Sequence, residues 1–414
     1  MTRSTTRSTR STRIRTVRTL RTGAVGLAAA AVAATAFTAP AQAAPAPAPP
    51  HHQAIQRAMD ALVTEGAPGV VAATRSDRHG TWKSESGTGD LTTGKPRNVN
   101  DRFRIASITK TFVATVLLQM EAEGRLKLDD TVEKHLPGLV RGNGNDGAKI
   151  TVRQLLNHTS GLYDYLNDPA YAEKYLIGEG FLKHRYDTLA PEFHIGVAMG
   201  HPPVFAPGDR AEYSNTNYVL AGLIIEKVGG RSYEHEVKKR IIKPLKLRST
   251  SQPGNSIHMP RPHSRAYTTL YLGPQAPVHD GTEMNGSQGW ADGDIISTTG
   301  DLNRFFSALM RGTLLPKKQL DAMKTTVPMS GIGYGLGIYT FTTSCGTKLW
   351  SHSGGIVGSL SLAATTEDGS RQLAFNLNGD WVDSGSAVTE AAFCGPTART
   401  KAPTTTQLPP ALPR

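Results

Sequence analysis

The 414-residue sequence predicts an α+β protein in which an antiparallel sheet flanked by helices is assembled from both ends of the chain, around an inserted, mainly helical lobe. Strand-like segments come early in the chain, helical periodicity dominates its middle, and strand-like segments return late. Roughly 350 residues remain once the termini are set aside, which is more than one compact core usually holds. We therefore expect two lobes.

The early segments predict a helix followed by two strands. Ile55, Met59 and Leu62 recur at helical spacing, and strand-like runs follow at residues 69–75 and 82–87. A second helix is expected directly after Ser107, where apolar residues again recur at helical spacing. Along the chain, the first two strands therefore precede the Ser107 helix.

The middle of the chain predicts helices, and its last third predicts strands. The expected elements are helices near 219–228, ending at Gly229-Gly230, and near 302–309, strands at 336–342, 349–353, 359–365 and 372–378, and a closing helix at 384–393. This order predicts an α/β lobe from residues 51–115 and 285–395 and a helical lobe from residues 116–284. A cleft between the lobes would hold the functional site.

The termini have the composition of processing and linker segments. Residues 1–43 hold seven Arg and no acid, then an Ala- and Val-rich run, then Ala41-Gln42-Ala43, which together predict a signal peptide. A retained anchor is the alternative, although the apolar run is short for a membrane span. We expect a Pro/Ala linker at 44–50 and a disordered Pro/Thr tail at 396–414. The mature protein is expected to be secreted, without a membrane anchor.

The charge balance argues against a nucleic-acid partner. The chain carries a formal net charge of +12, but without the seven Arg of the first 43 residues it has 39 basic and 34 acidic side chains. The basicity therefore belongs mostly to the targeting segment, and we expect no folded basic face after it. We expect no binding to nucleic acid.

Cys345 and Cys394 are the two cysteines of the sequence. In an exported protein an even pair is more often a disulfide than two free thiols, so we expect them to be bonded. The bridge would close a loop of about fifty residues and contribute at most about 4 kcal/mol to stability. A catalytic cysteine is the alternative, but no surrounding signature supports it.

Three short polar signatures stand in order along the chain: Ser107-Ile108-Thr109-Lys110, Tyr213-Ser214-Asn215 and His352-Ser353-Gly354. Ser107 and Lys110 are three residues apart, so on a helix their side chains face the same way. A lysine accepts the proton of a serine hydroxyl only if its pKa is lowered toward about 7 to 8. The sequence supplies this pair of groups but not the pKa.

The ordered trio resembles the motifs of serine β-lactamases and penicillin-binding proteins, which carry a Ser-x-x-Lys box, a Ser-x-Asn or Tyr-x-Asn box and a Lys-Thr-Gly box. Tyrosine in the second box and histidine in the third are similar to secreted D-alanyl-D-alanine carboxypeptidases, with class C β-lactamases and their esterase relatives close by. The resemblance covers residues 53–395 and includes the framework segments 155–162, 213–217, 296–298 and 334–337.

This resemblance implies three catalytic residues. Ser107 would attack a carbonyl carbon, Lys110 would accept its proton, and Tyr213 would pass a proton to the leaving group and later activate the deacylating water. Tyr213 could be the base instead only if cations lie against it, because tyrosine has a reference pKa near 10. The choice between Lys110 and Tyr213 as the general base stays open here.

The resemblance also implies a set of substrate-binding groups. Asn215 would hydrogen-bond the substrate's amide carbonyl. His352 and Ser353 would lie on an edge strand, polarise the site and bind the substrate carboxylate. The backbone N–H groups of Ser107 and Gly355 would form the oxyanion hole, and the glycines of the third box would let a ligand approach the backbone closely.

Two aromatic residues are less clearly placed. Trp290 matches a position that forms an apolar wall of the cleft in the family, although a tryptophan in the core is an equal alternative. His158 precedes Thr159 and Ser160 and looks like a second histidine–serine pair, but the resemblance places it in the framework. We therefore expect Trp290 to bind substrate and His158 to be structural.

We expect neither a cofactor nor a metal. The loop at residues 142–147 has the letters of a dinucleotide fingerprint, but it does not join a strand to a helix within a βαβ unit. The thirteen histidines show no metal-binding spacing such as His-Glu-x-x-His. The protein is expected to be a monomer.

The function implied is a secreted serine D-alanyl-D-alanine carboxypeptidase or transpeptidase that acts on peptidoglycan stem peptides and is acylated by β-lactams. The alternatives are a class C-type β-lactamase, an esterase of the same fold, or a catalytically silent cell-wall binding protein. One departure bears on substrate: Tyr339, Thr340 and Gly355 stand where an arginine and a threonine would clasp the substrate carboxylate. Ser353 with His352 is therefore expected to carry that recognition, with weak peptide cleavage and acceptance of uncharged esters.

Overall fold

The computed structural model describes residues 49–382 and 385–397. The predicted signal peptide, residues 44–48 of the predicted linker and residues 398–414 of the predicted tail lie outside this part of the chain. Helix α1 (Pro50–Thr64) begins inside the predicted linker, because the fixed φ of proline suits the first turn of a helix. At the other end, Gly395–Thr397 forms a 3₁₀ turn within the predicted tail.

A nine-stranded antiparallel sheet is built from both ends of the chain, which confirms the predicted fold class. Its strand order is β10-β11-β12-β13-β14-β15-β1-β2-β3, so the late strand β15 pairs with the early strand β1, and Val70 lies opposite Leu377. The strands are β1 (Gly69–Ser76), β2 (Gly80–Asp90), β3 (Lys95–Pro96), β10 (Val327–Met329), β11 (Ile332–Tyr334), β12 (Tyr339–Thr342), β13 (Lys348–Ile356), β14 (Ser359–Thr366) and β15 (Arg371–Leu377).

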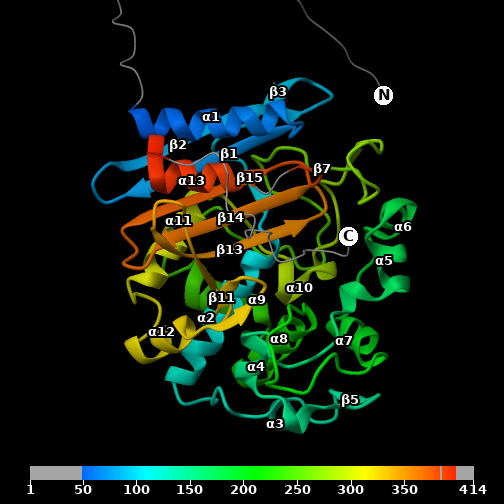
Figure 1. The fold of residues 1–414 in the computed structure, drawn as a ribbon. Coiled ribbons are helices and arrows are strands. Elements are labelled where there is room, and N and C mark those ends of the chain that lie inside the picture. Colours follow the sequence, from blue (N-terminus) through cyan, green and yellow to red (C-terminus); the bar gives the residue numbers. More distant parts are fainter. Residues whose placement is uncertain (1–48, 383–384, 398–414) are drawn as a thin grey trace, which may run out of the picture. The chain divides into compact units, whose positions relative to one another are not determined.

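Helices cover both faces of the sheet (Figure 1). Val70 and Ala72 of β1 pack in one cluster with α1 and α13 (Ser386–Cys394), whereas Val71 between them joins the main core with α11 (Thr299–Met310). This alternation is the period-two pattern of a strand buried on both faces. The core therefore continues through the sheet into the helical part of the chain.

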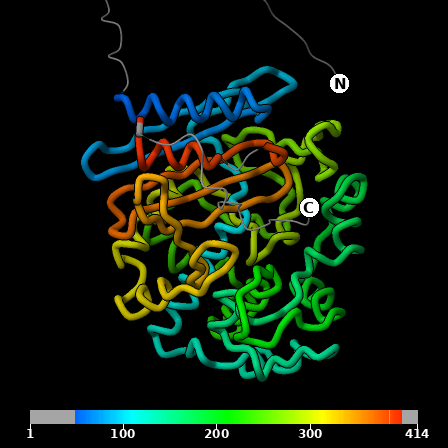
Figure 2. The backbone as a smooth tube through the Cα atoms, in the orientation of Figure 1, coloured from blue at the N-terminus to red at the C-terminus, as the bar shows by residue number. Residues whose placement is uncertain are grey.

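The middle of the chain is mainly helical and lies below the blue and orange ends in Figure 2. Helix α2 (Thr109–Ala122) is buried on nearly all sides and packs against α8 (Thr216–Gly229). Gly230 ends α8 in the left-handed conformation, as the predicted Gly-Gly ending requires. The other helices are α3 (Val132–His135), α4 (Val152–Leu156), α5 (Pro169–Tyr175), α6 (Gly178–His184), α7 (Pro191–Met199), α9 (Tyr233–Val237), α10 (Trp290–Gly293) and α12 (Lys317–Lys324).

The sheet extends further than the sequence indicated, because β10 and β11 were not predicted. Pro328 lies inside β10, and a proline in a short run argues against a strand. The two strands are joined by Ser330-Gly331, both with positive φ, which is the conformation of a tight hairpin turn. Six more short strands form three separate pairs: β4 (Phe103–Arg104) with β9 (Ile296–Ser297), β5 (Arg141–Gly142) with β6 (Asn145–Asp146), and β7 (Tyr267–Thr268) with β8 (His279–Asp280).

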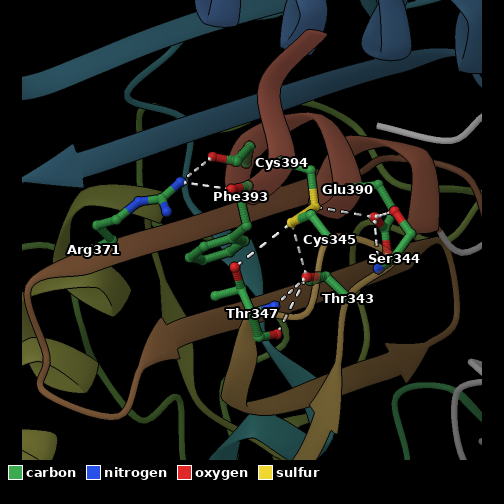
Figure 3. The surroundings of a disulfide bond; sticks show 9 residues. Thr343, Ser344, Cys345, Thr347, Arg371, Glu390, Phe393 and Cys394 are labelled. Atoms are coloured by element: carbon green, nitrogen blue, oxygen red, sulfur yellow. Dashed lines mark hydrogen bonds between the residues drawn. A yellow bond between two sulfur atoms is a disulfide. The ribbon is translucent and has the colours of Figure 1, made fainter. Parts of the chain in front are cut away.

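Cys345 and Cys394 form a disulfide, which confirms the predicted pairing (Figure 3). The bond ties the loop before β13 to the end of α13. Beside it, the Glu390 carboxylate accepts hydrogen bonds from the Ser344 backbone and hydroxyl, and Arg371 donates to two carbonyls in the last turn of α13. Within residues 49–382 and 385–397, none of the helices is both long and apolar enough to cross a membrane.

Candidate active site

The structure brings the predicted nucleophile and amine together at the start of α2. Ser107 lies in the 3₁₀ turn Ala106–Ile108, which runs directly into the helix. The Lys110 Nζ atom donates to the Ser107 Oγ atom at 3.0 Å. Ser107 is half-buried, whereas Lys110 has no exposed surface. The serine can therefore meet a substrate while the amine stays out of water.

The Ser107 turn is held against strand β13. Ala106 has a φ of +46°, which is strained for a residue with a side chain and persists only where its surroundings enforce it. A Cβ atom on Gly354 would lie 2.1 Å from the Ile105 carbonyl oxygen. Gly354 therefore admits the protein's own backbone at this point, rather than the ligand that the sequence analysis invoked.

Lys110 Nζ has three acceptors. Besides Ser107, it donates to the Asn215 Oδ1 atom at 2.7 Å and to the Asp292 backbone oxygen at 2.8 Å. These three acceptors match the three protons of an ammonium group. Burial lowers the pKa of Lys110 to about 8, while the charges of Asp292 and Asp164 oppose this shift. The amine can thus lose its proton near neutral pH, as a general base must.

Two buried carboxyl groups near Lys110 were missed by the sequence analysis. Burial raises the pKa of Asp164 to about 6 and that of Asp292 to about 7, against the attraction of Lys110. Asp292 accepts a hydrogen bond from the Tyr165 hydroxyl at 2.8 Å. These two aspartates belong to no common motif or spacing. The only sequence signal for their burial was their position in largely apolar stretches.

Asn215 connects Lys110 to one of these carboxyl groups. It stands at the N-cap position of α8, but its side chain makes no capping bond. Its Oδ1 atom accepts from Lys110, and its Nδ2 atom donates to Asp164 at 2.9 Å. The amide is therefore oriented by its neighbours, which leaves one N–H of Nδ2 for a substrate carbonyl.

Tyr213 also lies against Lys110. The Lys110 Nζ atom is 5.1 Å from the centre of the Tyr213 ring. Burial raises the pKa of Tyr213 well above 10, and contact with the Ser107 side chain opposes this shift. Such a phenol keeps its proton at neutral pH, so Tyr213 is not a phenolate base there, whereas the lowered pKa of Lys110 lets its amine accept a proton.

A directed chain of hydrogen bonds runs behind Tyr213. The His158 ring stacks on Tyr213 at 4.3 Å between centroids, and its Nδ1 atom accepts from the Ser214 backbone N–H. The proton of the neutral His158 ring must then be on Nε2, which contacts the Tyr334 hydroxyl at 3.2 Å, and that hydroxyl lies 2.9 Å from His352 Nε2. His158 thus supports Tyr213 from behind, as the framework assignment implied.

The environment of His352 differs from the sequence prediction. It is fully buried, its Nδ1–H donates to the Ser353 carbonyl oxygen at 2.6 Å, and burial lowers its pKa to about 3. A neutral, buried imidazole cannot attract a substrate carboxylate by charge. Strand β13 pairs with β12 only as far as Ser351, so His352 and Ser353 lie on its free edge, as predicted. Gly355 lies on this free segment.

A pocket opens beside Ser107. It encloses about 610 Å³ including its open mouth, and Tyr213, Asn215, Asp292 and Gly355 lie on its wall. Its other lining residues are Ala106, Tyr165, Leu166, Tyr171, Tyr175, Leu176, Tyr271, Met284, Gln288, Gly289, Gly293, Ile356 and Val357. The wall is thus mostly aromatic and aliphatic, and Asp292 is the sole ionisable acid or base on it apart from tyrosines.

Trp290, His352 and Ser353 are not on the wall of this pocket. Trp290 packs in the main core, edge-on to Tyr233 and against Gly222, where a Cβ atom would lie 2.8 Å from the indole ring. Trp290 is therefore a core residue, which is the alternative to the predicted substrate-binding role. The His352 side chain is linked to Tyr213 on the pocket wall through Tyr334 and His158.

The chain is similar in sequence and in structure to known hydrolases. Residues 52–379 match the Beta-lactamase family. A D-stereospecific amidohydrolase from Streptomyces sp. shares 52% sequence identity with a TM-score of 0.79, covering 83% of this chain and 99% of the other. D-amino acid amidase from Ochrobactrum anthropi SV3 shares 28% identity with a TM-score of 0.69, covering 82% of this chain and 98% of the other.

Curated relatives agree with this context. Penicillin-binding protein 4* of Bacillus subtilis (strain 168) is 29% identical over 289 residues, which cover 66% of this chain and 59% of the relative. The match to the putative penicillin-binding protein PbpX of the same strain spans about half of that protein's length, 53%, at 28% identity. The match to the Beta-lactamase family covers most of the chain, and the fold agrees. The chain therefore belongs to the beta-lactamase family, with a fold of the serine hydrolase type.

Proposed function

We propose that this protein is a serine amidohydrolase that cleaves amides and esters of D-amino acids with apolar or aromatic side chains. The observation that carries the proposal is the pocket wall beside Ser107, which is rich in tyrosine and aliphatic side chains and lacks a cationic group. A substrate carboxylate would find no counter-charge there, whereas an α-ammonium group would face Asp292. The preference for D-residues is inferred from the likeness to D-stereospecific relatives.

The proposed reaction proceeds through an acyl-enzyme. The Ser107 Oγ atom bonds to the substrate carbonyl carbon while its proton passes to neutral Lys110. Tyr213 donates a proton to the leaving nitrogen or oxygen as the bond to carbon breaks, and is reprotonated from Lys110. Water then attacks the acyl carbon, and its proton returns by the same route to release Ser107. The backbone N–H groups of Ser107 and Gly355 would stabilise the oxyanion.

The test measures kcat/KM for four substrates on protein lacking residues 1–43: D-phenylalanine amide, L-phenylalanine amide, D-phenylalanine methyl ester and D-alanine amide. We expect the D-phenylalanine amide to exceed its L-isomer by at least tenfold and D-alanine amide by a smaller factor. Equal rates for the two enantiomers would contradict the stereochemical assignment, and a preference for D-alanine amide would contradict the role of the aromatic wall.

A second candidate is the secreted D-alanyl-D-alanine carboxypeptidase or transpeptidase predicted from the sequence. It is favoured by the convergence of Ser107, Lys110, Tyr213 and Asn215 and by the penicillin-binding relatives. The two functions are separated by comparing an acyl-D-Ala-D-Ala peptide with its C-terminal amide. A strong preference for the free carboxylate would favour the carboxypeptidase, and rapid turnover of nitrocefin would favour a β-lactamase.

A further inference from the structure

A second hollow lies away from the active site and shares no residue with its pocket. It is lined by the start of α1, the turn between β1 and β2, the start of β15 and the end of α13, and it encloses about 1200 Å³ including its open mouth. We refer to it as the basic groove, because the ionisable residues on its wall, apart from Asp77 and the disulfide-bonded Cys394, are His51, His52, Arg75, Arg78, His79 and Arg371.

The positive charge of the basic groove is not neutralised by the described residues. Among them, no ion pair or hydrogen bond involves the guanidinium group of Arg75 or Arg78. The single carboxylate on the wall, that of Asp77, is bound by Arg311 at 2.5 Å. Arg371 donates to the Ala392 and Phe393 carbonyl oxygens, as Figure 3 shows, and the charge of Asp368 also acts on it.

The local field at α1 has the same sign. The imidazole rings of His51 and His52 lie 3.8 Å apart between centroids, tilted by 50°. Burial and the charge of His79 lower the pKa of both imidazoles, as expected for titratable groups in an unbalanced positive environment. The first turn of α1 has no side-chain cap, and the N-terminus of a helix carries a partial positive charge.

The two terminal segments outside the described residues have no acidic side chain that could supply the missing negative charge. Residues 1–48 contain seven arginines and no aspartate or glutamate, and residues 398–414 contain Arg399, Lys401 and Arg414 and no acid. Both terminal segments would add to the repulsion if they lay near the basic groove. A negatively charged group of another molecule can supply this charge.

We propose that the basic groove binds a ligand that carries phosphate groups. The planar guanidinium groups of Arg75 and Arg78 match phosphate oxygens in paired hydrogen bonds. Protonated imidazoles can add donors. The spread of cations over several elements suits a ligand with more than one negative charge, such as a chain of phosphates or a surface of phospholipid headgroups. This site is independent of the proposed amidohydrolase function.

The test is isothermal titration calorimetry of the protein lacking residues 1–43 with sodium tripolyphosphate, inorganic phosphate and citrate, at fixed ionic strength. A second arm is sedimentation with phosphatidylglycerol or phosphatidylcholine vesicles. We expect tripolyphosphate to bind at least tenfold more tightly than citrate. Binding to phosphatidylglycerol vesicles would identify a lipid source, and binding to tripolyphosphate without vesicle binding would identify a soluble or polymeric source. No binding in either arm would overturn the proposal, as would equal affinity for citrate.

Matched variants locate the site. Arg78 lies in an exposed turn, so Arg78→Gln should not disturb folding, and a loss of binding would reflect the lost guanidinium group. Arg75→Gln removes the second unpaired guanidinium group. Each is expected to weaken tripolyphosphate binding about fivefold. Arg57→Gln is the control, because Arg57 is exposed on the same helix α1 but does not line the groove. Equal effects of Arg57→Gln and Arg78→Gln would show diffuse attraction and overturn the proposed site.

Discussion

The buried cluster around Lys110 and the basic groove at the start of α1 both gather charged side chains, but they balance those charges in different ways. In the cluster, the Lys110 ammonium has three acceptors within 3.0 Å and two carboxyl groups nearby. In the groove, Arg75 and Arg78 form no ion pair among the described residues, and the Asp77 carboxylate on the wall is paired with Arg311. One region is internally compensated, and the other is left open.

This difference separates two uses of charge. Burial with internal partners holds groups at shifted pKa values, which suits proton transfer. An open, uncompensated surface can form new ion pairs with a ligand. Substitutions in one region should therefore leave the properties of the other region unchanged.

Ser107→Ala should produce the largest effect. Removing the nucleophile is expected to lower kcat/KM for D-phenylalanine amide by about 10³-fold or more. Intact-mass analysis should also show loss of covalent labelling by a fluorescent penicillin. Tripolyphosphate binding at the basic groove should be unchanged. Equal mass gain in wild type and Ser107→Ala would show that the nucleophile is a different residue.

Replacing both Cys345 and Cys394 by alanine should act on the other side of the sheet. The disulfide closes 49 residues, and the chain-entropy estimate for such a loop gives a loss of up to about 4 kcal/mol in unfolding free energy. Chemical denaturation measures this loss. The value of kcat/KM should stay within about twofold, because the bond is remote from Ser107. A large loss of activity in the folded variant would contradict the separation of the two regions.

Much of the fold followed from local patterns that tertiary contacts reinforce. The helix before β1, the strands β13, β14 and β15 and the Gly230 helix ending were predicted because apolar periodicity and glycine conformation act over a few residues. The hairpin β10–β11 was missed because Pro328 argues against a strand in isolation. Pairing in a sheet overrides that local preference when the proline lies at an edge.

The site was predictable only where residues act as motifs. Ser107, Lys110, Tyr213 and Asn215 converge as the boxes implied. Asp292 could not be predicted from the sequence. Its role depends on its closeness to Lys110 in the folded protein, and the two residues belong to no common motif. The charge of His352 could not be predicted either. Its imidazole is neutral because the folded protein buries it completely on β13.

Tyr334→Phe should give a moderate effect by cutting the hydrogen-bond chain between His158 and His352. Two buried imidazole nitrogens would lose their partner, which costs about 1 to 3 kcal/mol of unfolding free energy. Because His158 stacks on Tyr213, kcat should fall more than KM changes. Tyr163→Phe is the matched control, since its hydroxyl bonds only to a backbone oxygen near the surface. If both variants behaved alike, Tyr334 would have no special link to the site.

Asp292→Asn should produce the smallest but most informative effect. The negative charge of Asp292 raises the pKa of Lys110, so replacing it by a neutral amide should lower that pKa further below about 8. The effect should be full above pH 7, where Asp292 is ionised in the wild type. If neutral Lys110 is the base, the acidic limb of the kcat/KM profile moves to lower pH by about one unit. If Lys110 must stay charged and Tyr213 is the base, the basic limb moves instead. Asp209→Asn, an exposed acid, is the control and should shift neither limb. A profile unchanged by Asp292→Asn would show that the internally compensated cluster does not set the pKa of Lys110.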